Sequence, residues 1–220
     1  MTKTPEENGS TRTVERALAL LAVVCESGQL SLSEAARETN LAVSTALRLL
    51  RTLEQAGFVV RDNDGNYRAG ARVIQIGAQA LSDQALVSLA AGAMEDLVQA
   101  TGESAYLSVP GHRDTALYLA ITEGTHPVRH VSWVGRTVPL DGSAVGAVMG
   151  GRTPAIGYVV VESGVEPDVT AIAAPIMLRG RVVAAISLLV PSYRADAAKV
   201  ASYGSAVVEA AGRVSERLGG

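Results

Sequence analysis

Apolar residues recur three and four positions apart in three runs within the first sixty residues, which is the spacing of amphipathic helices. In the first run Val14, Leu18, Leu21 and Cys25 recur at helical spacing, and Ala17, Leu20 and Val24 widen this apolar stripe, which we expect to pack inward. The sequence therefore predicts a first helix that ends at Gly28 and holds the Cys25 thiol in the core.

The second and third runs follow closely. Ser33 precedes an alanine-rich run and is its candidate N-cap, because a serine hydroxyl there can accept from the first free backbone NH groups. Ser44 is a second candidate N-cap, and Leu47, Leu50 and Leu53 mark the inward face of a third helix. The spacing of the three runs is typical of a helix-turn-helix motif.

Two short β-prone runs, 58–61 and 66–68, flank the tetrapeptide DNDG. An Asp-Gly pair between such runs favours a hairpin, since glycine adopts the required backbone angles at the least cost. Three helices followed by a two-stranded ribbon predict a winged helix-turn-helix.

Helical spacing returns after residue 70, and beyond residue 101 the period changes towards two, as in strands. We expect strands at 104–109, 116–122, 128–134, 157–162, 171–177 and 182–189, a short helix at 144–149 and a closing helix at 196–218. Strands packed by helices form an α+β domain. The predicted divisions are a flexible tail at 1–10, the winged helix-turn-helix at 11–70, a linker and connecting helix at 71–100, and the α+β domain at 101–220.

Composition excludes several classes of protein. The 220 residues suffice for two domains, and the formal net charge of −3 does not itself indicate a nucleic-acid partner. A single cysteine excludes an internal disulfide, and His112, His126 and His130 form no Cys/His cluster, so we expect no metal and no cofactor. We find no apolar h-region and no membrane-spanning stretch in the sequence, and we expect a cytoplasmic protein without a membrane partner.

The outer face of the third predicted helix carries groups suited to DNA. With its leucines inward, Ser44, Thr45, Arg48, Arg51 and Thr52 lie on or near the outer surface. In a helix-turn-helix the first residues of this helix enter the major groove, so Ser44, Thr45 and Arg48 are candidates for base reading or positioning. The further candidate DNA contacts, towards phosphates or an adjacent groove, are Ser33, Arg61, Asn63, Asn66 and Arg68.

Many ordered segments resemble one family. The first part carries TVERAL at 13–18, LSEAA at 32–36, STALRLL at 44–50, LEQAGF at 53–58 and YRAG at 67–70. The second part carries TGES at 101–104, HPVR at 126–129, VGR at 134–136, VPL at 138–140, AAPI at 173–176 and VVAAIS at 182–187. Over nearly its full length the chain resembles the IclR family of bacterial transcriptional regulators.

This resemblance implies a homodimer or dimer of dimers, more often a repressor than an activator, that binds double-stranded operator DNA and lacks catalytic activity. It also implies a GAF/profilin-like α+β domain that binds a small-molecule effector. The chain departs from the family pattern in that only residues 150–156 stand where members usually carry a longer helical stretch. Val161, Ala171 and Leu189 occupy positions where the family often has an acidic residue, a cysteine and a serine.

These departures shape the expected pocket. The polar candidates are Ser143, Thr170, Ser187 and the backbone NH groups at the start of the short helix. The full set of candidate effector contacts is Trp133, Leu140, Ser143, Ala144, Val145, Val161, Thr170, Ala171, Ser187 and Leu189. We therefore expect an effector more apolar than a short keto acid, or a site that no longer binds one.

Two other functions stay open at this point. A winged helix can serve as a protein-docking module. The second domain could also be a small-metabolite enzyme, although the sequence shows no nucleophile with a matching base. His130 is interpreted as structural, and Glu166 as part of a solvated loop.

Overall fold

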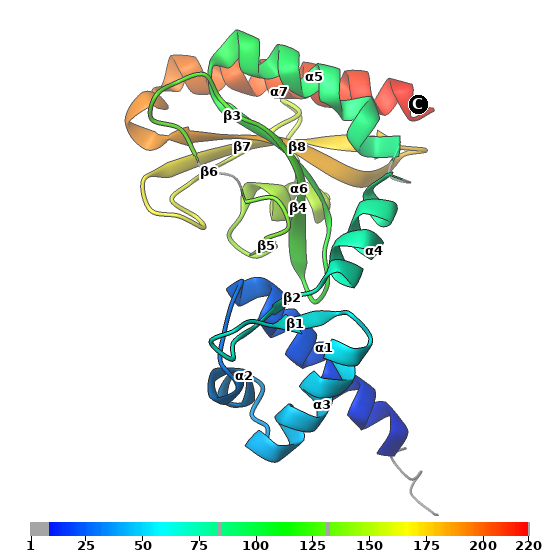
Figure 1. The fold of residues 1–220 in the computed structure, drawn as a ribbon. Coiled ribbons are helices and arrows are strands. Elements are labelled where there is room, and N and C mark those ends of the chain that lie inside the picture. The colour runs from blue at the N-terminus through cyan, green and yellow to red at the C-terminus, as the bar shows by residue number, and fades with distance from the viewer. Residues whose placement is uncertain (1–8, 83–84, 131–132, 220) are drawn as a thin grey trace, which may run out of the picture. The chain divides into compact units, whose positions relative to one another are not determined.

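A computed structural model describes residues 9–82, 85–130 and 133–219. The chain divides into two compact units, Met1–Asp83 and Gln84–Gly220, each with a core of its own (Figure 1). Most of the tail expected at 1–10 lies outside the described residues. No helix in the described ranges is both long and apolar enough to cross a bilayer.

The first unit is a winged helix-turn-helix, as the sequence predicts. Its elements are α1 (Gly9–Ser27), α2 (Leu32–Glu38), α3 (Val43–Gln55), β1 (Val59–Arg61), β2 (Tyr67–Ala69) and α4 (Ala71–Ser82). β1 and β2 pair antiparallel, with Val60 opposite Arg68. Gly65 has a φ of 85° in the turn between them, which is the conformation that its position in the hairpin requires.

Only part of the apolar stripe predicted for α1 is buried. Leu20 and Val24 are fully buried, whereas Val14 and Leu18 are 55% and 58% exposed and Cys25 is exposed. α1 has apolar residues on more than one face, and α3 and the ribbon pack against the face that carries Leu20 and Val24. The prediction of a buried Cys25 was therefore wrong.

Both predicted N-caps were also wrong. Ser31, not Ser33, caps α2, where it forms a reciprocal capping box with Glu34. The Ser31 backbone NH donates to Glu34 Oε2 at 2.8 Å, which lowers the pKa of that carboxyl. Helix α3 begins at Val43 with Ala42 as its N-cap, so Ser44 lies inside the first turn.

The second unit is an antiparallel sheet with helices on both faces. Its elements are α5 (Ala85–Thr101), β3 (Ser104–Pro110), β4 (Thr115–Thr122), β5 (Thr137–Pro139), α6 (Ala144–Met149), β6 (Val159–Glu162), β7 (Val169–Leu178), β8 (Arg181–Pro191), the 3-10 turn η1 (Ser192–Arg194) and α7 (Ala197–Arg217). The strand order is β5-β4-β3-β8-β7-β6.

A strand was predicted at 128–134, and residues 131–132 of this range lie outside the described residues. The described residues of the range form no strand. The edge strand next to β4 is instead β5, where Val138 pairs with Ala116. This range contains alternating apolar residues, but its described part, which comes after Gly124 and Pro127, is irregular. Val128 is 60% exposed.

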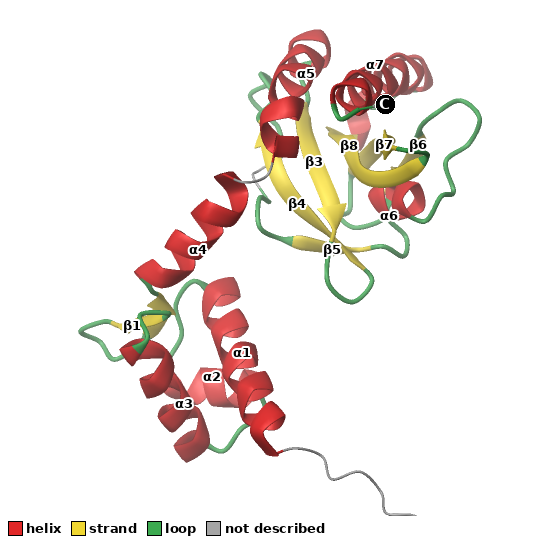
Figure 2. Ribbon diagram, turned by 90° about the vertical axis from the view of Figure 1, so that its right-hand side faces the viewer, coloured by secondary structure: helices red, strands yellow, loops and turns green. Residues whose placement is uncertain are grey.

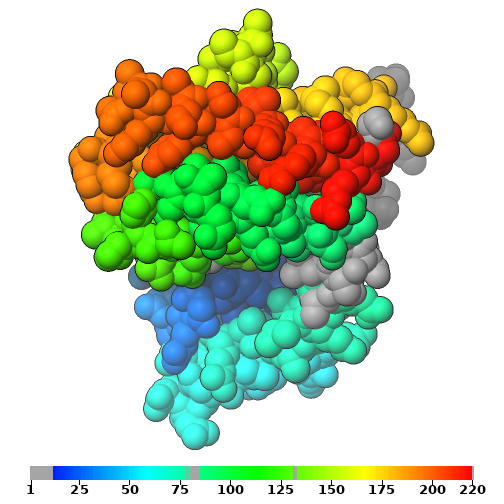
Figure 3. Space-filling model, turned by 90° about the horizontal axis from the view of Figure 1, so that it is seen from above, coloured from blue at the N-terminus to red at the C-terminus, as the bar shows by residue number. Residues whose placement is uncertain are grey.

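Side chains alternate between the two faces of the sheet. Helices α5 and α7 cover one face of the sheet and α6 lies on the other (Figure 2). On β8, Ile186 and Leu188 face the core formed with α5 and α7, and Ser187 and Leu189 face the α6 side. α5 and α7 lie side by side over the first face (Figure 3). The expected connector at 71–100 is therefore split, because α4 belongs to the first unit and α5 is part of the second core.

Candidate DNA-binding face and ligand pocket

Helix α3 presents a polar outer face. Ala46, Leu49 and Leu50 are buried, and Leu47 and Leu53, predicted to point inward, are half-buried. The opposite side exposes the predicted contact residues Ser44, Arg48, Arg51 and Thr52, with Thr45 half-buried. The buried face of α3 thus includes Leu49, which was not predicted to point inward. The predicted polar face is still exposed.

The arginine side chains of this unit differ in whether they already contact other residues of the unit. Within the described ranges, Arg48, Arg51 and Arg68 form no ion pair or side-chain hydrogen bond, and all three are exposed. Arg61 donates from Nε to the Gly65 carbonyl at 3.1 Å and lies over the Tyr67 ring. Arg48, Arg51 and Arg68 are therefore free to meet phosphates or bases, whereas Arg61 braces the wing.

The wing turn is built around Asp62. Its Oδ1 accepts from the backbone NH groups of Asp64 and Asn66 at 3.0 and 2.9 Å, and its Oδ2 accepts from Gln29 at 2.7 Å. Asn63 is exposed in this turn and Asn66 is half-buried. Ser33, the other predicted DNA contact, is exposed on α2. The wing therefore holds a fixed shape with a negative charge at its base.

The second unit contains a pocket on the α6 side of the sheet. The empty volume of this pocket is about 420 Å³, which includes open solvent at its mouth. The centre of a water molecule can reach about 30 Å³ of this volume. Eight of the ten predicted effector residues line it: Trp133, Ser143, Ala144, Val145, Val161, Ala171, Ser187 and Leu189. Leu140 and Thr170 are not among the lining residues.

Strand register explains why distant residues meet in this pocket. Val161 on β6 is paired with Ala171 on β7, which is paired with Leu189 on β8. Ser187, two residues before Leu189, lies on the same face and is paired with Tyr106 on β3. A row of side chains thus crosses the sheet beneath α6.

Close packing holds α6 above this row. A Cβ on Gly146 would collide with the backbone of Leu140, so the helix can approach the preceding loop only with glycine there. Ser143 caps the helix by accepting from Gly146 NH at 3.1 Å and donates to the Pro139 carbonyl at 2.6 Å.

The three hydroxyls proposed as ligand donors therefore differ. The Ser143 hydroxyl is already used in capping. Thr170 lies between Val169 and Ala171 of the pocket wall, so its side chain points to the other face of β7, where Oγ1 lies 2.9 Å from Ser192 Oγ. Ser187 Oγ is buried and has no hydrogen-bond partner among the described residues. Of the three hydroxyls, Ser187 alone is left available in the pocket.

Sequence reasoning missed a polar cluster at the pocket wall. His130 and Glu166 line the pocket beside Tyr118, although His130 was interpreted as structural and Glu166 as part of a solvated loop. His130 Nε2 lies 2.9 Å from Glu166 Oε2, and His130 Nδ1 lies 2.7 Å from the Tyr106 hydroxyl. His130 and Glu166 are 36 residues apart in irregular segments, so no periodic pattern connects them.

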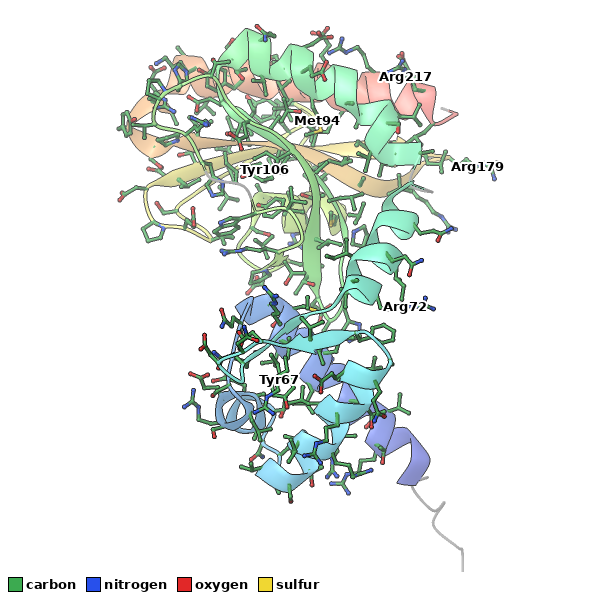
Figure 4. All side chains as sticks on the ribbon, in the orientation of Figure 1. Tyr67, Arg72, Met94, Tyr106, Arg179 and Arg217 are labelled. Atoms are coloured by element: carbon green, nitrogen blue, oxygen red, sulfur yellow. The ribbon has the colours of Figure 1, made fainter. Side chains whose placement is uncertain are left out.

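Burial shifts the pKa of two tyrosines, Tyr118 in the cluster and Tyr106 beneath it. Burial raises the pKa of Tyr118 to about 12, and the Glu166 charge adds to this effect. Burial also raises the pKa of Tyr106, which lies beneath the cluster and points from β3 towards the α6 side (Figure 4). Both phenols are therefore hydrogen-bond donors at neutral pH.

A buried ion pair anchors the segment that carries His130 and Trp133. Arg194 in η1 donates from Nε and Nη2 to the two carboxylate oxygens of Glu103, both at 2.8 Å. Arg194 Nη2 also donates to the Val128 carbonyl, and the His130 carbonyl accepts from Ser104 Oγ at 3.3 Å. The side chain of Glu103 is fully buried, so this pair fixes one wall of the pocket.

Comparison with known proteins identifies the family. The IclR helix-turn-helix domain model matches residues 13–63, and the bacterial transcriptional regulator IclR C-terminal model matches residues 78–150. The chain belongs to the IclR family. The described residues contain no group of three or more His, Cys, Asp or Glu that could hold a metal ion.

Individual members of the IclR family extend this result. The chain is 33% identical over 145 residues to the glycerol operon regulatory protein of Streptomyces coelicolor, covering 65% of this chain and 57% of that protein. It therefore spans little more than half the length of that relative. The fold matches an IclR regulator from Alicyclobacillus acidocaldarius with a TM-score of 0.81 at 24% identity, covering 94% and 99% of the two chains. An IclR homolog from Microbacterium hydrocarbonoxydans, solved in complex with 4-hydroxybenzoate, matches with a TM-score of 0.74 at 23% identity, covering 94% and 98%.

Proposed function

We propose that this IclR-family chain is a ligand-responsive transcriptional regulator, most simply a repressor, that binds operator DNA as a dimer or dimer of dimers. The observation that carries the proposal is the outer face of α3, where exposed Arg48 and Arg51 have no partner within the described ranges. Such side chains at a helix-turn-helix can reach base edges and phosphates. Because it acts on bacterial DNA, we place its work in the cytoplasm.

The energetics of DNA binding support the proposal of two copies. Residues 1–70 carry 8 basic and 9 acidic side chains, so one winged helix has no excess of positive charge. Pairing doubles the number of phosphate contacts, on which most of the affinity depends. Val14 and Leu18 on α1 and Ile74 and Ile76 on α4 are exposed apolar side chains that a partner copy could cover.

The second unit supplies the regulation in this proposal. A small molecule in its pocket can shift the regulator only if it binds one arrangement of the paired copies more tightly than another. The 4-hydroxybenzoate complex of the M. hydrocarbonoxydans homolog supports a small-molecule role for a pocket on this fold. The apolar residues Val161, Ala171 and Leu189 support the expectation of an effector more apolar than a short keto acid.

We expect Arg48→Ala to reduce preference for the operator, while Arg68→Ala weakens binding to every DNA sequence. A base contact is worth about 1–3 kcal/mol of discrimination, whereas loss of a phosphate contact lowers the salt slope by about one unit. Fluorescence anisotropy with operator and scrambled duplexes at several salt concentrations separates the two effects. Arg179→Ala, which removes an exposed arginine of the second unit, serves as the matched control.

Unchanged discrimination in Arg48→Ala would show that α3 does not read the bases. A winged helix that docks on protein would bind neither duplex, even at low salt. That result would favour the second candidate function.

A further inference from the structure

The described wall of the ligand pocket contains one carboxylate. Among its described lining residues, the carboxylate belongs to Glu166, and no lysine or arginine lines the cavity. The Glu166 side chain is 35% exposed and lies where the pocket opens to solvent. A ligand that enters passes this carboxylate.

Two contacts hold the His130 ring against the pocket wall. His130 Nδ1 lies 2.7 Å from the Tyr106 hydroxyl, and His130 Nε2 lies 2.9 Å from Glu166 Oε2. The ring therefore fixes the position of the Glu166 carboxylate at the pocket.

The nearby arginines are held outside the pocket. The Arg129 guanidinium is paired with Glu123 at 2.9 Å, and that of Arg136 lies over the Trp133 ring, 5.7 Å from its centroid. Neither side chain belongs to the wall of this pocket, although Arg129 lines the neighbouring depression together with His130 and Glu166. A carboxylate ligand in the pocket would therefore lie beside Glu166 with no arginine in the described wall to pair with it, which is unfavourable.

Other groups in the pocket suit an uncharged or amino-bearing ligand. Ser187 Oγ is fully buried, faces the cavity and has no partner in the described ranges. A buried hydroxyl without a partner is uncommon and is satisfied when a bound molecule supplies one. The Tyr118 and Trp133 rings lie in the same wall with centroids 6.2 Å apart and give a planar ligand two aromatic contacts.

We propose that the pocket takes small aromatic ligands that bear a hydroxyl or amino group and no carboxylate, with Ser187 as the polar anchor and Glu166 as the group that rejects anions. This assignment rests on the proposed function only in treating the pocket as a ligand site. In this assignment Glu166 is the residue that selects against negatively charged ligands.

Isothermal titration calorimetry of the full chain with benzyl alcohol, benzylamine and benzoate tests the assignment, because the three probes differ chiefly in the polar group. We expect the alcohol and the amine to bind at least about tenfold more tightly than benzoate, a difference of about 1.4 kcal/mol. Ser187→Ala should weaken the alcohol and the amine by roughly three- to tenfold, the usual net worth of one hydrogen bond.

Glu166→Gln should raise benzoate affinity, while Glu162→Gln, an exposed carboxylate on β6 outside the pocket wall, should leave all three affinities unchanged. Benzoate binding as tightly as the alcohol and the amine, or no binding by any probe, overturns the assignment. So does benzoate binding that Arg136→Ala abolishes, because Arg136 would then be an anion anchor. The titration contains no DNA, so its failure is separate from a failure to bind the operator.

Discussion

Replacing Arg194 with methionine should lower the free energy of unfolding of the second unit by about 3–5 kcal/mol, because the buried Glu103 carboxylate loses both of its hydrogen bonds from Arg194 and keeps only the more distant His126 Nε2, at 3.7 Å, among its described side-chain contacts. Both carboxylate oxygens of Glu103 accept from Arg194 at 2.8 Å, and the Glu103 side chain has no exposed surface. Urea unfolding followed by the fluorescence of Trp133 measures this effect, since the chain has one tryptophan and it lies in the second unit.

The double variant Glu103→Gln/Arg194→Met distinguishes the effect of losing the ion pair from the effect of losing the packing of the Arg194 side chain. With the carboxylate removed, we expect part of the stability to return, because the penalty comes mainly from an uncompensated charge. Arg213→Met is the matched control, since Arg213 pairs with Asp96 on the exposed surface of α5 and α7 and such pairs contribute at most about 1 kcal/mol. An Arg194→Met loss no larger than that of the control would contradict the account.

Leu50→Ala should destabilise the first unit by about 2–5 kcal/mol and leave the second unit folded. Leu50 is fully buried between α1, α3 and the ribbon, so truncation leaves a cavity in a small core. Loss of helical circular dichroism from the first unit should precede the Trp133 transition in urea. Leu18→Ala removes the same atoms from a side chain that is 58% exposed and should change the first transition by less than about 1 kcal/mol.

A single transition shared by both signals in Leu50→Ala would show that the two units unfold together. An equal effect of Leu18→Ala would show that Leu18 is covered, as in a dimer contact. The protein concentration dependence of that transition distinguishes a dimer contact from packing within one chain.

The order of elements could be predicted from the sequence because periodicity reports local structure directly. Three helical runs, the Asp-Gly turn at Gly65 and the alternating residues of β8 all correspond to elements of the structure. The inward face of α1 could not be fixed, because Val14 and Leu18 are as apolar as Leu20 and Val24. Only the packing partners decide which face is buried.

The pocket was predictable as far as strand alternation reaches. Ser187 and Leu189 share a face by period two, and the register brings Val161 and Ala171 beside Leu189. His130 and Glu166 lie on irregular segments whose positions depend on long-range contacts such as Arg194 with the Val128 carbonyl. Their meeting has no periodic signature in the sequence.

The central claim is that two copies of this chain read duplex DNA through the outer face of α3. Titration of the wild-type chain onto DNA from upstream of its own gene, by anisotropy with salt from low to physiological, tests the claim most directly. The account predicts two copies per site, tighter binding than to scrambled DNA, and an affinity that falls steeply with salt. Equal affinity for both duplexes, or no binding at low salt, would contradict it.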